Sequence, residues 1–282
     1  MIDLHHHLIY GVDDGPADLA TSLSLAEMAL AEGITQIVCT PHANASYTYP
    51  LPLIQNRLQE LRDLLAERLE LHLGCDFHLS SENVSDALLS FPRYSIAERG
   101  YLLVEFPDLL IPPDMETALY QLQSAGYTLI ITHPERCPAI QQQPGRLATW
   151  IRRGALVQIT AGSLTGRFGP QAEAFSKAIL KRHWVHFVAT DAHHPEWRPP
   201  RMQRAMGIVR NSQGEAGMER IFQRNPLAAL TGERLEEQPT PLDLEEDKEL
   251  DFQQGELYVV RRRNSYGALH TPLWSRIFGR GV

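Results

Sequence analysis

Short apolar runs recur along the first 235 residues, and nearly every one is followed by a side chain that can bind a metal ion. Stretches with one apolar helical face separate the runs, so the chain consists of a series of strand–helix units. The expected strands lie at residues 1–4, 36–39, 69–73, 101–104, 128–131, 155–159 and 185–189. The expected helices lie near residues 19–32, 53–68, 83–89, 115–125, 146–153, 171–182 and 200–210.

The positions of the metal-binding side chains distinguish between two architectures. Strand–helix units in series form either a parallel barrel or a doubly wound sheet. In a closed barrel the C-terminal ends of the strands converge on one mouth, whereas in an open sheet they are spread along an edge. The pattern therefore favours an α/β fold, a distorted (β/α)7 barrel similar to a TIM barrel.

Nine histidine and acidic residues at these strand ends are candidate metal ligands, because imidazole and carboxylate groups suit divalent ions. They are His5, His7, Asp14, His42, Asp76, Glu105, His133, Asp191 and His193. His5 and His7 are two residues apart at a strand end and should point the same way, whereas His6 should point away from them. Nine ligands exceed the needs of one ion, so at least two ions are expected, and three would also fit.

The segment 11–15 has two interpretations. It fits an Asx-turn and a helix cap ahead of residue 19 as well as a metal-binding loop. Asp13 is expected to serve the turn or to orient a ligand, and Asp14 is taken as the ligand. The segment 162–166, with Arg167, fits either the edge of a substrate entrance or a tight turn before the next helix.

Charge and cysteine content exclude several classes of function. The net charge of −8, without a basic stripe before the last residues, argues against nucleic-acid binding. No apolar run approaches the length of a membrane span, and the N-terminus lacks the features of a signal peptide. Three scattered cysteines do not form a disulfide framework, so a cytoplasmic location is expected. None of them has an arginine six residues later, which excludes the Cys-x5-Arg chemistry of cysteine phosphatases.

The chain changes character beyond residue 235. Residues 1–235 are expected to form the metal-dependent domain. Residues 236–282 combine an acidic, proline-containing stretch with an apolar and basic end that includes Trp274 and Phe278. This segment is expected to be a C-terminal tail that is partly irregular or mobile, with a docking segment for a partner or a membrane surface as the alternative.

Read in order, the motifs resemble the PHP (polymerase and histidinol phosphatase) superfamily and, within it, the bacterial capsule- and exopolysaccharide-associated manganese-dependent tyrosine-protein phosphatases. The matching segments are Met-Ile-Asp-Leu-His-His-His, Gly-Val-Asp-Asp-Gly, Cys-Thr-Pro-His, Val-Glu-Phe-Pro, Thr-His-Pro-Glu-Arg, Gln-Ile-Thr-Ala-Gly-Ser-Leu-Thr-Gly and Thr-Asp-Ala-His. The resemblance implies a seven-unit PHP barrel and a three-metal site, commonly with Mn²⁺, although Fe, Zn or Mg would also suit the ligands. It further implies dephosphorylation of protein phosphotyrosine.

The sequence departs from the family pattern at four positions. Asp76 stands where such proteins usually have the longer glutamate, and His6 stands where they usually have a small residue. Thr190 and His194 replace the commoner serine and asparagine. The ligand types are preserved, but one ion could be held more loosely or the metal preference could change.

The parts predict a mechanism of phosphate-ester hydrolysis. Neighbouring ions lower the pKa of bound water from about 15.7 towards about 7, so that a metal-bound hydroxide attacks phosphorus in line. Arg136 and Arg198 are the expected phosphate clamps, because guanidinium offers two donors to phosphate oxygens. Either arginine could instead form a surface salt bridge. A phenolate leaves readily because the pKa of tyrosine is about 10.

The resulting hypothesis is a protein-tyrosine phosphatase that regulates capsular or exopolysaccharide biosynthesis. Its expected substrate is a phosphotyrosine-bearing protein, a tyrosine kinase of polysaccharide assembly, and the enzyme could be oligomeric. The alternative is a small-molecule phosphomonoesterase of the histidinol-phosphate or nucleotide type on the same metals. Amidohydrolase chemistry is disfavoured because no lysine lies near the motifs. A metal-stabilised scaffold without catalysis is the remaining alternative.

Overall fold

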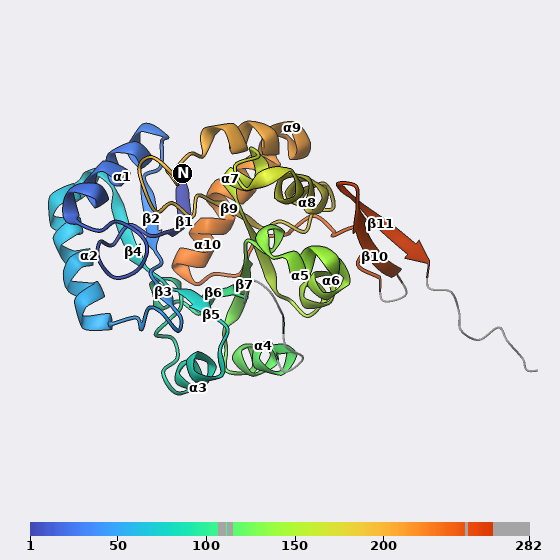
Figure 1. Ribbon diagram of the computed structural model, residues 1–282, viewed down its shortest axis with the longest axis horizontal. Helices are drawn as coiled ribbons and strands as arrows, with labels where there is room; N and C mark the ends of the chain where they lie inside the picture. The colour runs from blue at the N-terminus through green and yellow to red at the C-terminus, as the bar shows by residue number, and fades with distance from the viewer. Residues whose placement is uncertain (107–110, 112–114, 246–247, 262–282) are drawn as a thin grey trace, which may run out of the picture.

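The computed structural model describes residues 1–106, 111, 115–245 and 248–261. Helices surround a core of strands, and a hairpin lies at one edge (Figure 1). The strands are β1 Ile2–His6, β2 Gln36–Cys39, β3 His42–Ala43, β4 Glu70–Leu73, β5 Asp76–His78, β6 Tyr101–Glu105, β7 Thr128–Thr132, β8 Leu156–Thr160, β9 Phe187–Ala189, β10 Lys248–Gln253 and β11 Glu256–Arg261. The helices are α1 Leu19–Ala31, α2 Leu51–Leu65, α3 Ser81–Leu89, α4 Met115–Ser124, α5 Pro138–Gln142, α6 Pro144–Arg152, α7 Ala161–Leu164, α8 Gly169–Lys181, α9 Gln203–Glu219 and α10 Asn225–Thr231.

The strands β1–β9 are parallel and follow one another around a ring. Two of the seven strand units consist of two halves, of which only the first was predicted: β3 follows β2 beyond Pro41, and β5 follows β4 beyond Gly74 and Cys75. The first halves pair with each other, as do the second halves, and β5 continues the pairing through β6, β7 and β8 to β9. All seven strand units were predicted, and the predicted bounds lie within two residues of those of β1, β2, β4, β6, β7, β8 and β9, whereas β3 and β5 were not predicted.

The ring closes where the last strand meets the first. The amide of Asp191 donates to the carbonyl of His5 at 2.8 Å, and the amide of His7 donates to the carbonyl of Ala192 at 2.9 Å. The buried carboxylate of Asp3 adds a side-chain link, since its Oδ1 accepts the amide of Thr190 at 2.9 Å. These bonds join the first and last strand units and confirm the predicted α/β barrel.

Local signals explain where the helices begin and end. The side chain of Asp18 accepts the amide of Thr21 at 2.8 Å and caps the first turn of α1. Gly33 and Gly126 follow α1 and α4 with φ values of +83° and +105°, a backbone region that glycine adopts without steric cost. Among the described helices, none combines the length and the apolar character needed to cross a membrane.

Two apolar clusters stabilise the barrel. Successive residues of a strand point to opposite faces of the sheet and therefore belong to different clusters. Leu102 and Val104 pack in the larger cluster, which includes residues of the surrounding helices, while Leu103 belongs to the smaller one. The smaller cluster comprises Ile2, Leu4, Val38, Ile96, Tyr101, Leu103, Ile130, Phe187, Ala229 and Leu230. Its last two members come from α10, a helix that the sequence did not predict. This helix therefore closes the N-terminal end of the barrel, opposite the ends that carry the candidate ligands.

A hairpin within the predicted tail was also not foreseen. β10 and β11 pair in antiparallel register through a turn at Gln254 and Gly255, both with positive φ, as in a type I′ turn. Phe252 packs edge-on against Phe175 of α8, with ring centroids 4.9 Å apart, and Leu257 is buried. The domain boundary at residue 235 stays a prediction. Residues 262–282, with the apolar and basic end, lie outside the described residues.

The closed N-terminal end of the barrel generates a stability prediction. Leu230→Ala should lower the free energy of unfolding by about 2–5 kcal/mol, because it leaves a cavity beneath Ile2 and Leu4. Leu227→Ala, on the same helix but 48% exposed, should change it by no more than about 0.5 kcal/mol. Urea unfolding monitored by circular dichroism checks both values, and equal midpoints for the two variants would contradict this account of α10.

Candidate metal centre

The C-terminal ends of the strands bring all nine predicted ligands together at one mouth. They form four overlapping clusters, in each of which the potential ligand atoms lie within 4.8 Å of one another. The clusters are His7, Asp14, His42 and His193; His5, His7 and Asp76; His5, His133 and Asp191; and His42, Asp76 and Glu105. Side chains up to 188 residues apart in the sequence, such as His5 and His193, thus line one site (193 − 5 = 188).

The backbone at three strand ends is irregular and turns side chains into the mouth. In β1 the register against β2 shifts between Asp3 and His6, and His5 and His7 end on the same side with their Nε2 atoms 3.3 Å apart. His133 and Asp191 adopt φ values of +33° and +52°. Such left-handed backbone costs about 1–3 kcal/mol at a non-glycine residue and occurs preferentially at functional sites.

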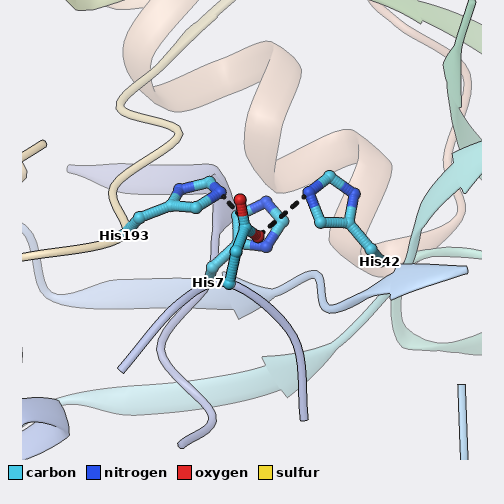
Figure 2. Close-up of side chains that lie close together, drawn as sticks. His7, His42 and His193 are labelled. Carbon is cyan, nitrogen blue, oxygen red and sulfur yellow. Dashed lines mark ion pairs between the residues drawn. The ribbon is translucent and has the colours of Figure 1, made fainter. Parts of the chain in front are cut away.

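The spacing of the ligand atoms suits divalent ions. The Oδ1 of Asp14 lies 3.4 Å from the Nε2 of His42 and 3.4 Å from the Nε2 of His193. Figure 2 shows His7, His42 and His193 turned towards one another around these contacts. Two ligand atoms about 2.1 Å from one tetrahedral ion lie about 3.4 Å from each other. The observed separations therefore leave room for an ion between the groups.

Asp76 provides the test of whether these residues fit metal ions. Its side chain is buried between His5 at 3.4 Å and His42 at 3.2 Å, and neither carboxylate oxygen has a hydrogen-bond partner. A buried carboxylate is costly without hydrogen bonds or a counter-charge. The nearest groups are imidazole nitrogens in a metal-binding arrangement, so a bound cation would satisfy this carboxylate, and the donor set fits one.

The charges at the mouth shift the pKa values of the candidate ligands. Burial alone lowers the pKa of an imidazole, but Asp191 and Asp76 outweigh it and raise the pKa of His5 to about 9. Asp14 and Asp76 likewise outweigh burial and raise the pKa of His42 to about 12. Burial would raise the pKa of Asp76, yet the neighbouring imidazoles hold it well below its usual range. In the metal-free protein, protons on these histidines therefore balance the carboxylates.

Two residues behind the ligands fix the orientation of the rings. Asp13 Oδ2 contacts His7 Nδ1 at 2.7 Å while its Oδ1 accepts the amide of Gly15, so Asp13 both shapes the turn and orients a candidate ligand. Gln158 Oε1 contacts His5 Nδ1 at 3.0 Å. Such contacts select the tautomer that leaves Nε2 towards the metal. No role was predicted for Gln158, although an amide inside the apolar strand β8 is a usable signal.

Arg136 and Arg198, the predicted clamps, both lie at the mouth. Each donates to Oδ2 of Asp191, and Oδ1 of the same carboxylate faces His5 at 3.3 Å and His7 at 3.5 Å. The guanidinium carbons lie 4.4 Å and 5.7 Å from the ring centroid of Phe168, a residue that the sequence analysis did not single out. The partner of both arginines is thus a candidate metal ligand, so both guanidinium groups lie at the candidate metal centre. The clamp role itself stays a prediction.

The remaining positions lie around this site. His6 belongs to none of the clusters, as expected, and is buried with no hydrogen-bond partner for either ring nitrogen. Thr190 bonds Asp3, and His194 stacks on Trp197 with centroids 5.2 Å apart. His78 was missed: its Nδ1 lies 3.7 Å from Glu105 Oε2, at the end of β5. The sequence did contain a signal for His78, because it lies two residues after Asp76 in the same strand and should point the same way.

Comparisons with known proteins agree with this geometry. Tyrosine-protein phosphatase YwqE of Bacillus subtilis (strain 168) is 35% identical over 218 residues, which cover 76% of this chain and 85% of that protein. Tyrosine-protein phosphatase CpsB of Streptococcus agalactiae is 29% identical over 241 residues, which cover 82% of this chain and 98% of that protein. A chain from the crystal structures of YwqE from Bacillus subtilis and CpsB from Streptococcus pneumoniae, described as unique metal-dependent tyrosine phosphatases, matches at 32% identity with a TM-score of 0.79. The match covers 86% of this chain and 100% of that chain.

A family model described as capsular polysaccharide synthesis, CpsB/CapC, matches residues 1–231. The matched segment begins at the first strand of the barrel and ends with Thr231, the last residue of α10, so it contains every candidate ligand. The chain therefore belongs to the CpsB/CapC family of capsular polysaccharide synthesis.

Proposed function

We propose that this protein is a metal-dependent protein-tyrosine phosphatase that acts in the regulation of capsular or exopolysaccharide biosynthesis. The observation that carries the proposal is the mouth itself, where nine metal-capable side chains adjoin two arginines. The assignment of phosphotyrosine as the substrate is supported by the relatives, which are named tyrosine phosphatases. A tyrosine kinase of polysaccharide assembly in the cytoplasm is the proposed substrate, supported by the family assignment.

The side chains of the mouth divide the work of hydrolysis. The four clusters would hold divalent ions, which would supply a nucleophile from water near neutral pH and neutralise phosphate charge. Arg136 and Arg198 bind the phosphate oxygens, which compete with Asp191 for their donors. Gln158 and Asp13 keep the His5 and His7 rings oriented towards the ions. The leaving tyrosine is a phenolate of low basicity, so little help from a general acid is needed.

The proposed metal is Mn²⁺, in two or three ions. Carboxylates suit manganese, whereas imidazole also suits iron and zinc, and the clusters mix the two donor types. Four carboxylates and five imidazoles contribute, so the donor set suits a divalent ion that accepts both oxygen and nitrogen ligands.

Metal removal tests the proposal directly. The purified protein should contain two or three equivalents of divalent metal, and chelation should lower hydrolysis of a phosphotyrosyl peptide by at least about 100-fold, with Mn²⁺ restoring it. Metal analysis combined with peptide turnover measures both. Unchanged turnover by the stripped protein would refute the mechanism, and faster turnover of histidinol phosphate or nucleotides than of the peptide would support the small-molecule alternative.

Metal binding should also release protons. His5 and His42, with pKa values raised to about 9 and about 12, are protonated at pH 7 in the metal-free protein and must lose their protons to bind an ion. The affinity for Mn²⁺ should therefore rise with pH from about 6 to at least about 9, the pKa of His5. Calorimetric titrations in two buffers of different ionisation enthalpy measure the released protons. Identical heats in both buffers would show that the histidines are already neutral.

The arginines generate a separate kinetic prediction. Arg136→Lys replaces a two-donor fork with a single ammonium, so kcat/KM should fall by about 100-fold for peptide and small aryl phosphates alike. Metal content should stay unchanged. Arg68→Lys, an exposed pair with Glu27 on α1, is the matched control and should behave as wild type. A wild-type rate for Arg136→Lys would assign that arginine to structure alone.

A further inference from the structure

A cavity lies beside the metal centre and shares a residue with it. Its volume is about 440 Å³, and it is lined by the segment after β8, the segment after β9, the start of α9 and Glu32, which follows α1. Arg198 lines this cavity while its guanidinium also contacts His193 and Asp191 at the mouth. Phe168 lines it too, and the same ring lies beneath both clamp arginines. The cavity is therefore a neighbour of the position where the substrate phosphate binds.

Positive charge dominates the cavity. Its lining contains four arginines, Arg167, Arg198, Arg201 and Arg204, against one acidic residue, Glu32. This excess is local, because the whole chain carries a net charge of −8. A confined patch of one sign within a protein of the other sign favours ligands of complementary charge.

Two of these arginines have their charge compensated within the protein. Arg201 pairs with Glu32 at 3.1 Å, and the same carboxylate accepts the amides of Met202 and Gln203 at 3.0 Å each. Arg198 pairs with Asp191. These groups therefore add little to the net attraction of the cavity for an anion.

The other two arginines retain uncompensated charge. Arg167 donates to the backbone carbonyls of Glu196 and Trp197, which carry no formal charge. Arg204 is exposed and has no acidic partner among residues 1–106, 111, 115–245 and 248–261. Both face a cavity large enough for a side chain. A carboxylate entering it would form charge-assisted hydrogen bonds, which are stronger than those between neutral groups.

We propose that this cavity binds an acidic side chain of the phosphoprotein, close in sequence to the phosphotyrosine, so that the enzyme prefers phosphotyrosine in an acidic context. The inference rests on the proposed function and extends it from the phosphate to the residues that flank it. Arg198 and Phe168 connect the two positions, and Arg167 and Arg204 supply the specificity. A peptide is the occupant that the site favours, because the phosphate and the second anion must be joined by a short chain.

The test compares two phosphotyrosyl peptides that differ only in having glutamate or glutamine at the flanking positions, with p-nitrophenyl phosphate as a substrate that has no flank. The full-length, metal-loaded enzyme should show a KM about tenfold lower for the glutamate peptide, with similar kcat. Raising the salt concentration to about 0.5 M should shrink this preference. Arg204→Glu should abolish or invert the preference while leaving turnover of p-nitrophenyl phosphate unchanged.

The matched control is Arg210→Glu, the same change on the same helix, where Arg210 pairs with Glu215 outside the cavity. It should keep the wild-type preference. Equal KM values for the two peptides, or an equal effect of Arg204→Glu on both, would overturn the cavity assignment while leaving the phosphatase assignment intact. Hydrolysis of p-nitrophenyl phosphate without hydrolysis of either peptide would overturn both.

Discussion

The buried carboxylate of Asp191 connects the parts of this site. One of its oxygens accepts hydrogen bonds from Arg136 and Arg198, and the other faces the imidazoles of His5 and His7. A carboxylate is tolerated at such depth only when positive groups surround it. The same contacts that make its burial possible hold the two arginines beside the candidate metal ligands. One side chain therefore links the two arginines to the candidate metal centre.

The two ends of the barrel have different roles: the apolar base contributes to stability, and the polar mouth carries the candidate metal ligands. Leu4 of β1 packs in the smaller cluster with Leu230 of α10, while His5 and His7 at the end of the same strand face the candidate ligands. Left-handed backbone at His133 and Asp191 adds strain at the mouth. An apolar base can offset that strain, because its contacts do not depend on bound ions.

The barrel and the residues that meet at its mouth could be predicted from the sequence, because both follow from one geometric rule. In a parallel barrel the strand ends converge, so residues such as Asp76 and His193 can be assigned to one site without knowing their distances. Phe168 lies in no matching segment, Gln158 lies in one that contributes no candidate metal ligand, and the left-handed turn at Asp191 depends on contacts far away in the chain. The hairpin was missed because an acidic, proline-containing segment with short alternation looks like a tail.

Closure of the ring between Asp191 and His5 has a consequence for synthesis of the protein. A nascent chain emerges from the ribosome with its N-terminus first, so β1 is exposed long before β9 exists. Until residues 191–193 appear, neither the arginine-binding carboxylate nor the last imidazole is available, and the edge of β1 has no partner on that side. Half-made chains therefore lack two of the nine candidate metal ligands, and the candidate centre is completed only when the last strand unit has been synthesised.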